Sequence, residues 1–162
     1  MTGTPPTLHM IFGKIASGKS TLCVKLGTEA GTVVISEDDW LNALFADDMA
    51  SIKDYGRCAR KLRGVVGPHV VSLLQAGVSV VLDFQANTVD ARNWMRGIFE
   101  KAGASHILHV LDVPDDVCLE RLRMRNAEGG HAFAVTEDQF HQILRHVVLP
   151  SADEQFNVVL HG

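Results

Sequence analysis

The strongest constraint on the fold is an eight-residue run near the N-terminus. Residues 13–20 have the sequence GKIASGKS and match the pattern GxxxxGK[ST] at every fixed position. An apolar run at Thr7–Phe12 precedes this segment, and a helical pattern at Lys19–Leu26 follows it. In a strand–loop–helix unit of this kind, the glycines let backbone amides close around an anion, and the helix N-terminus adds its dipole. The run therefore predicts a loop that binds the phosphates of a nucleoside triphosphate.

Individual positions of this phosphate loop have separate predicted roles. Lys19 is expected to reach the β- and γ-phosphates, and Ser20 is expected to ligate Mg²⁺. The residues expected to bind the nucleotide are Gly13, Lys14, Ile15, Ala16, Ser17, Gly18, Lys19, Ser20 and Thr21. The sequence has no GxGxxG pattern, which argues against a dinucleotide-binding domain.

Short apolar runs alternate with helical patterns along the rest of the chain. The further strand candidates are Thr32–Ser36, Ser79–Asp83, Ile107–Asp112 and Phe156–Leu160. The further helical patterns are Gly56–Gln75, Val89–Ala102, Asp115–Asn126 and Glu137–His146. Near-continuous apolar strands are typical of parallel sheets that helices cover on both faces. The pattern predicts a three-layer α/β P-loop fold with a parallel sheet of about five strands, and a short lid at Asn126–Val135.

Composition narrows the class of partner. A chain of 162 residues is expected to form one domain over residues 1–162. Its 15 basic and 19 acidic residues give a net charge of −4, which makes a nucleic-acid partner less favoured. No apolar run reaches the ~20 residues that span a bilayer, and Cys23, Cys58 and Cys118 fit no disulfide framework or paired zinc site. We expect a cytoplasmic protein with no membrane partner, and its oligomeric state is left open.

An acidic cluster follows the second strand candidate. Asp38 belongs to the run Glu37–Asp39, at the carboxyl end of the expected strand Thr32–Ser36. Ligands of open parallel sheets bind outside these carboxyl ends. Asp38 is therefore a candidate for accepting the proton of a hydroxyl that attacks the γ-phosphate. The alternative is a helix N-terminus that Ser36 caps and acidic residues stabilise without chemistry.

Further polar residues follow the third strand candidate. Asp83 ends the apolar run Val80–Leu82, and its carboxylate is a candidate for holding Mg²⁺ through water or for orienting the acceptor. Gln85 and Asn87 are candidates for hydrogen bonds to a substrate. They equally suit a loop and an N-cap before the next helix.

Two arginines precede the predicted lid. Arg121 and Arg125 are four residues apart and share one face of a helix. A pair of guanidinium groups stabilises the charge of a phosphoryl group in transfer when a lid closes over it. The alternative is an exposed helix end whose cations offset the dipole. The phosphate loop in the same chain favours the lid interpretation.

The order of these segments resembles that of the small P-loop kinases. The sequence resembles the AAA_33-type kinases and the kinase domain of phage-type polynucleotide kinases. It resembles zeta toxin and chloramphenicol phosphotransferase more distantly. The matching segments are GKIASGKST at 13–21, ISEDDW at 35–40, VVLDFQAN at 80–87 and HVLDVPDDVCLERLRMRN at 109–126. The resemblance implies that Asp38 activates the acceptor hydroxyl, that Asp83 helps place the acceptor, and that the arginines at 121–125 belong to a lid.

One position departs from the polynucleotide kinases. Leu41 stands where those enzymes have an arginine that grips the acceptor's phosphate, which weakens the case for a nucleic-acid acceptor. We expect an ATP-dependent kinase that transfers the γ-phosphoryl group of Mg-ATP to a hydroxyl of a small molecule, with ATP rather than GTP implied by the resemblance. The alternatives are an ATP-binding regulatory module or slow ATPase, and a 5′-hydroxyl polynucleotide kinase.

Overall fold

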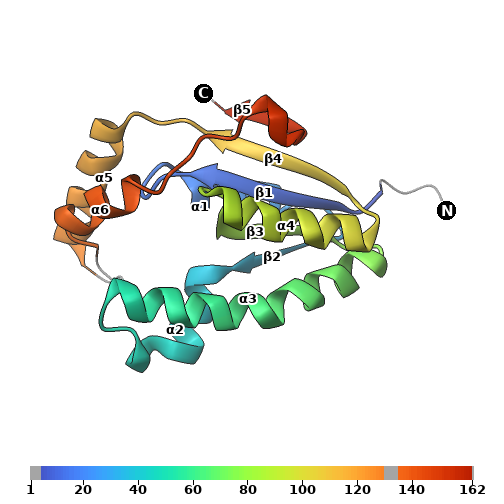
Figure 1. The fold of residues 1–162 in the computed structure, drawn as a ribbon, viewed down its shortest axis with the longest axis horizontal. Coiled ribbons are helices and arrows are strands. Elements are labelled where there is room, and N and C mark those ends of the chain that lie inside the picture. Colours follow the sequence, from blue (N-terminus) through green and yellow to red (C-terminus); the bar gives the residue numbers. More distant parts are fainter. Residues whose placement is uncertain (1–4, 130–134, 162) are drawn as a thin grey trace.

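A parallel β-sheet occupies the centre of the computed structural model, which describes residues 5–129 and 135–161 (Figure 1). The strands are β1 (Thr7–Gly13), β2 (Thr32–Ser36), β3 (Ser79–Gln85), β4 (Ser105–Leu111) and β5 (Val158–His161). They lie in the order β2-β3-β1-β4-β5, and all four pairs of neighbours are parallel. The structure confirms the predicted α/β class and the number of strands expected for the sheet.

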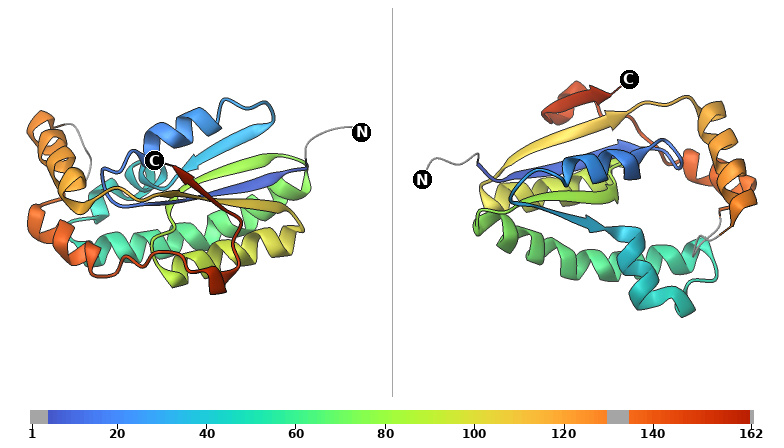
Figure 2. Two further views of the ribbon diagram at one scale, coloured as in Figure 1. Left: turned by 90° about the horizontal axis from the view of Figure 1, so that it is seen from above. Right: turned by 180° about the vertical axis from the view of Figure 1, so that it is seen from behind.

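Helices cover both faces of the sheet. They are α1 (Lys19–Leu26), α2 (Glu37–Phe45), α3 (Ile52–Gln75), α4 (Val89–Ala102), α5 (Asp115–Glu128) and α6 (Glu137–Leu144), with 3-10 turns η1 (Ala46–Asp48) and η2 (Ala152–Glu154). Helices α3 and α4 lie on one face, and α1 lies on the other (Figure 2). No helix of the described segments is long and apolar enough to cross a membrane.

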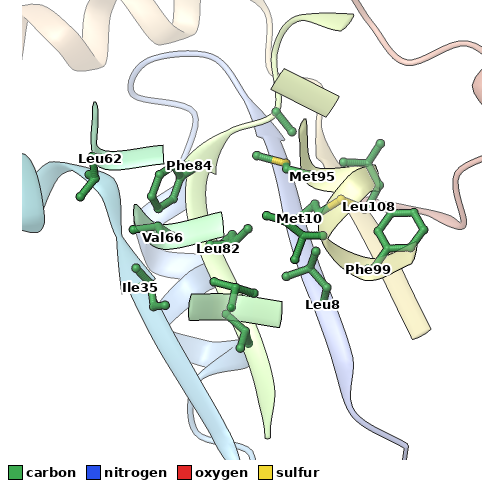
Figure 3. Close-up of a cluster of buried hydrophobic side chains, with 14 of the residues drawn as sticks. Leu8, Met10, Ile35, Leu62, Val66, Leu82, Phe84, Met95, Phe99 and Leu108 are labelled. Atoms are coloured by element: carbon green, nitrogen blue, oxygen red, sulfur yellow. The ribbon is translucent and has the colours of Figure 1, made fainter. Parts of the chain in front are cut away.

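The burial of β1 explains its continuous apolar sequence. Leu8 and Met10 point toward α3 and α4, where they join the largest cluster of buried side chains (Figure 3). Ile11 points to the opposite face and packs with Cys23 of α1. Because helices cover both faces, successive residues of this strand are apolar, as expected for a central parallel strand.

Some element boundaries differ from those predicted. The segment after β2 forms helix α2, and α3 begins at Ile52 rather than at Gly56. Ser51 accepts a hydrogen bond from the Asp54 amide (3.1 Å), so this N-cap sets the start of α3. Strand β5 begins at Val158 instead of Phe156, whose ring packs edge-on against that of Phe99. Helix α5 extends to Glu128, and residues 130–134 of the predicted lid lie outside the described residues.

The sheet order places a crevice at one end of the molecule. The connection from β1 leads through α1 toward β2, whereas that from β3 leads through α4 toward β4. Neighbouring strands whose connections leave in opposite directions form the switch point at which open α/β sheets bind ligands. The phosphate loop follows β1 at this point, and β3 carries Asp83 and Gln85 to the same end.

Candidate functional site

The phosphate loop joins β1 to α1 with a backbone shaped for an anion. Ala16 and Gly18 have φ values of 63° and 97°, both in the left-handed region. Such a turn directs successive amides into a concave nest. Gly18 is the N-cap of α1, and no side chain caps this helix end. The N–H groups and the positive dipole end of α1 therefore point toward the space where phosphate is expected.

Asn87 fixes the start of the phosphate loop. The Gly13 amide donates to Asn87 Oδ1 (3.0 Å), and Asn87 Nδ2 donates to the Gly13 carbonyl oxygen (2.8 Å). The Asn87 side chain is buried, with 4% of its surface exposed. Both ends of its amide are thus engaged with the loop. The structure places this predicted substrate residue behind the loop, where it positions the backbone.

Lys19 and Asp83 meet at the switch point. Lys19 Nζ lies 2.6 Å from Asp83 Oδ1, and both side chains are largely buried. Asp83 comes from the end of β3 and lines a cavity of about 450 Å³ together with Ser20 and Asp39. The structure therefore brings together the lysine predicted to reach phosphate and the two oxygen ligands predicted for Mg²⁺. Asp39 adds a carboxylate to this cavity that the sequence interpretation did not assign.

A second lysine ties the loop to α5. Lys14 Nζ donates to the Val113 carbonyl oxygen (2.7 Å) and to Asp115 Oδ1 (2.7 Å). Asp115 is the first residue of α5, so the contact fixes the base of this helix against the phosphate loop. The side chain of Lys14 thus acts within the protein, and its backbone remains the part expected to meet the nucleotide.

The structure separates the three arginines of α5. Arg121 and Arg125 line the same cavity as the phosphate loop, and Arg121 Nη1 donates to the Ala16 carbonyl oxygen (3.4 Å). Within the described residues, the buried Nε atom of Arg125 has no hydrogen-bond partner. Arg123 instead pairs with Glu137 at the start of α6. The helix spacing alone does not distinguish Arg123 from its two neighbours. The structure leaves the guanidinium groups of Arg121 and Arg125 at the cavity, where they can bind a ligand.

The cavity beside the phosphate loop has a volume of about 840 Å³. Helices α5 and α6 lie at the carboxyl end of β1, with α2 and the beginning of α3 across from them (Figure 1). The residues from α2, α3 and the turn between them form the α2–α3 wall of the cavity: Asp38, Leu41, Asn42, Met49, Ile52 and Tyr55. Gln85, at the end of β3, also lines the cavity. The predicted base Asp38 therefore lines the same cavity as the phosphate loop.

The start of α2 has the predicted helix cap, and the role of Asp38 as a base stays a prediction. Ser36 accepts a hydrogen bond from the Asp39 amide (3.3 Å), which caps the helix. This cap places Asp38 in the first turn, where its carboxylate lines the cavity. A capped helix end and a candidate base are thus compatible at this position, because the cap fixes the backbone that carries Asp38.

A buried network behind Asp38 was not predicted from the sequence. The Tyr55 hydroxyl lies 3.2 Å from Glu37 Oε1 and 3.3 Å from Asp38 Oδ1, so its hydrogen bond is directed to either carboxylate. Glu37 is buried, which raises its pKa, although Arg63 at 3.6 Å opposes this effect. The Arg63 guanidinium also lies 5.3 Å from the ring centroid of Trp94. This network holds the first turn of α2 against α3.

The geometry fits Mg-ATP. Triphosphate needs a nest of amides and several cations, and the cavity supplies both, with Lys19, Arg121 and Arg125 in its lining. Magnesium prefers oxygen ligands, and Ser20 and Asp83 present a hydroxyl and a carboxylate to one cavity. Among the described residues the Nε atom of Arg125 has no hydrogen-bond partner, and a phosphate oxygen in the cavity would supply one.

A family model places the chain among known proteins. The AAA domain family AAA_33 matches residues 8–150, which is most of the sequence. The chain belongs to this family. The match confirms the predicted resemblance to small P-loop kinases, because the family's segment contains the phosphate loop, both strand-end acids and the arginines of α5. No curated protein matches the sequence significantly.

Solved structures share the fold. A candidate kinase from Chloroflexus aurantiacus j-10-fl has a TM-score of 0.76 at 21% identity, covering 99% of this chain and 86% of that chain. A sugar kinase from Janibacter sp. HTCC2649 has a TM-score of 0.71 at 19% identity, with coverages of 97% and 85%. Kti12 of Chaetomium thermophilum, in complex with ADP-AlF3, has a TM-score of 0.74 at 13% identity, with coverages of 97% and 89%. At these identities the likeness concerns the fold, which is that of the small P-loop kinases.

Proposed function

We propose that this AAA domain protein is a kinase that transfers the γ-phosphoryl group of ATP to a hydroxyl of a small molecule. One observation carries the proposal: Asp38 lines the same cavity as the phosphate loop and the two arginines of α5. A phosphate-binding loop alone supports nucleotide binding. A carboxylate across the cavity adds a group that can accept a proton from an attacking hydroxyl. The resemblance stated above supports ATP as the donor, and so does the ADP-AlF3 bound to Kti12, which has the same fold.

Each residue has a role in this reaction that follows from its place. The loop amides and Lys19 bind the β- and γ-phosphates, while Asn87 keeps the loop in position. Asp38 orients the acceptor hydroxyl and takes its proton as that oxygen bonds to phosphorus. Arg121 and Arg125 stabilise charge on the transferred group.

Magnesium is the cofactor that the oxygen ligands support. Ser20 and Asp83 would hold it, and it would neutralise charge on the phosphate oxygens when bound. Lys19 Nζ lies 2.6 Å from Asp83 Oδ1, so the cation proposed to bind phosphate and the carboxylate that would hold the metal are adjacent.

The test uses γ-labelled ATP and Mg²⁺ with a cellular metabolite extract, and in parallel with a 5′-hydroxyl oligonucleotide. Wild type is expected to label a small metabolite, and Asp38→Asn is expected to lose at least about a hundredfold of this activity, since general base catalysis contributes roughly 10²–10⁴-fold. Asp47→Asn, an exposed change on the same segment, serves as the matched control. Full transfer activity in Asp38→Asn contradicts the assignment of the base.

The two alternatives give different results in the same assay. Label on the oligonucleotide favours a polynucleotide kinase. Tight ATP binding without transfer to either acceptor favours a regulatory module or a slow ATPase. The described cysteines Cys23, Cys58 and Cys118 are all free and buried, which supports the prediction of a reducing, cytoplasmic compartment.

A further inference from the structure

The α2–α3 wall differs in character from the rest of the cavity. Its members Leu41, Met49 and Ile52 present apolar surface, and Tyr55 adds an aromatic ring. Leu41 is 1% exposed, so the wall is backed by the core and is not a loose surface patch. Within the described residues, Asp38 is the one charged side chain of this wall. The wall thus offers an apolar surface beside a single carboxylate.

The cations of the cavity all lie on its other side. Among the described residues that line it, Lys14 and Lys19 belong to the phosphate loop, and Arg121 and Arg125 belong to α5. Lys19, Arg121 and Arg125 suit the phosphates of the donor nucleotide, and Lys14 is paired with Asp115. Among the described residues, an acceptor that binds to the α2–α3 wall would therefore find no cation in the cavity that is not already paired with an acid or needed by the donor phosphates.

Two arginines of α3 lie close to this wall but are engaged elsewhere. Arg57 Nη2 lies 3.4 Å from Asp54 Oδ1 and donates to the Asp48 carbonyl oxygen (3.4 Å). Arg63 lies against Glu37 and the ring of Trp94. Neither arginine lines the cavity. Moving Arg63 toward an anionic ligand would leave the buried Glu37 carboxylate unpaired, which is costly.

The local charge also disfavours an anion. Residues 37–55 contain six acids and one base, Lys53. Glu37 and Asp54 are paired with arginines of α3, which leaves Asp38, Asp39 and the acids of η1. A phosphate or carboxylate on the acceptor would lose its hydration against an apolar surface and face the carboxylate of Asp38, the one acid of this group that lines the cavity. A buried anion without a partner is strongly disfavoured.

We propose that the acceptor is an alcohol with an apolar body and no negative charge. Its body would lie on the half-buried side chains of Met49 and Ile52, which the buried Leu41 supports from the core, and its hydroxyl would face Asp38. The amides of Asn42 and Gln85 also line the cavity and offer neutral hydrogen-bonding groups. The inference rests on the proposed kinase function and narrows its substrate class. It disfavours sugar phosphates, nucleotides and polynucleotide ends.

Binding tests the inference independently of catalysis. The probes are three alcohols with the same benzyl group: neutral 3-phenylpropane-1,2-diol, cationic phenylalaninol and anionic 3-phenyllactate. Binding is followed by ligand-observed NMR in the presence of Mg²⁺ and a non-hydrolysable ATP analogue. The neutral and cationic probes are expected to bind, with the anion weaker by roughly tenfold or more. Equal or tighter binding of the anion, or no binding of the neutral and cationic probes, overturns the inference.

A variant of the α2–α3 wall is expected to change the preference for the neutral probe over the anionic one. Met49 is half-buried between η1 and α3, so Met49→Arg adds a cation to the wall without placing it in the core. This variant is expected to gain affinity for 3-phenyllactate and to lose its preference for the diol, whereas Met49→Leu is expected to keep the wild-type order. Thermal unfolding and binding of the ATP analogue verify that both variants are folded. An unchanged preference in Met49→Arg contradicts the role of the wall.

Transfer of label from γ-labelled ATP is measured on the same probes as a separate readout. Transfer to the anionic probe at equal or higher kcat/KM overturns the acceptor class while the kinase function stands. Selective binding of the non-anionic probes, without transfer to these or to any metabolite in the extract, upholds the acceptor class and contradicts the kinase function. Failure of the proposed acceptor class and failure of the proposed kinase function therefore give different results.

Discussion

At the scale of single residues, the site depends on side chains that hold others in place. Asn87 binds the backbone of Gly13, and Tyr55 lies within hydrogen-bond distance of Asp38. Both side chains bridge segments that are far apart in the sequence. Such residues position the groups that are expected to meet the ligand. Replacing them is therefore expected to weaken ligand binding by displacing those groups.

Asn87→Ala is expected to weaken nucleotide binding and to destabilise the fold. The change leaves the Gly13 amide and carbonyl without their side-chain partner, and each unsatisfied buried group costs about 1–3 kcal/mol. The affinity for an ATP analogue, measured by calorimetry, should fall roughly tenfold or more, since 1.4 kcal/mol corresponds to a factor of ten. Asn93→Ala, at an exposed position of α4, is the matched control. Wild-type affinity in Asn87→Ala contradicts this role.

At the scale of elements, features that depend on local sequence patterns were predictable, and contacts that depend on packing between distant segments were not. The phosphate loop was predictable because its residues are contiguous. The place of Asp83 near the carboxyl end of β3 was predictable because it follows the apolar run Val80–Leu82, although the strand continues to Gln85. The contact between Glu37 and Tyr55 was not, because it forms only when α3 packs back across α2. The separation of Arg123 from Arg121 likewise depends on Glu137, which belongs to another helix.

Three strands share a row of histidines that the sequence interpretation did not connect. His9 of β1, His109 of β4 and His161 of β5 are joined by nitrogen–nitrogen contacts of 2.9 Å. His109 lies two residues beyond the register partner of His9, and His161 lies two residues beyond that of His109, so the rings meet diagonally on the face of the sheet that also carries Ile11. Burial, with smaller contributions from the other two histidines, lowers the pKa of His109 to about 4.

This row predicts a loss of stability in mild acid. The unfolded state takes up a proton on His109 near pH 6.5, whereas the folded state does so only near pH 4. The unfolded state therefore binds more protons between these values, and the free energy of unfolding falls as the pH is lowered through this window. Denaturant unfolding from pH 7.5 to 4 measures the slope. His109→Gln, which cannot titrate, is expected to show a shallower slope, and an unchanged slope contradicts the assignment.

At the scale of the whole molecule, one buried arginine joins distant segments. Arg92 of α4 is 0% exposed, and its Nε atom lies 2.8 Å from Glu154 Oε1. Its Nη1 atom donates to the carbonyl oxygens of Ala86 (2.9 Å) and Val148 (2.8 Å). These partners lie after β3, after α6 and in η2. The side chain thus ties the segment leading to β5 to the end of β3, next to the residue that anchors the phosphate loop.

Arg92→Met should therefore affect both stability and the site. The change leaves Glu154 and two carbonyl groups without their cation, and breaking a buried ion pair costs roughly 3–5 kcal/mol. Denaturant unfolding at neutral pH should show this loss, and Arg145→Met, at an exposed position after α6, should change little. Glu154→Gln retains an oxygen acceptor for the guanidinium and is expected to lose less than Arg92→Met. Because Asn87 follows Ala86 directly, Arg92→Met should also weaken binding of the ATP analogue under conditions where it remains folded. A fully stable Arg92→Met variant with wild-type affinity would mean that the segment leading to β5 and the end of β3 are held together without this arginine.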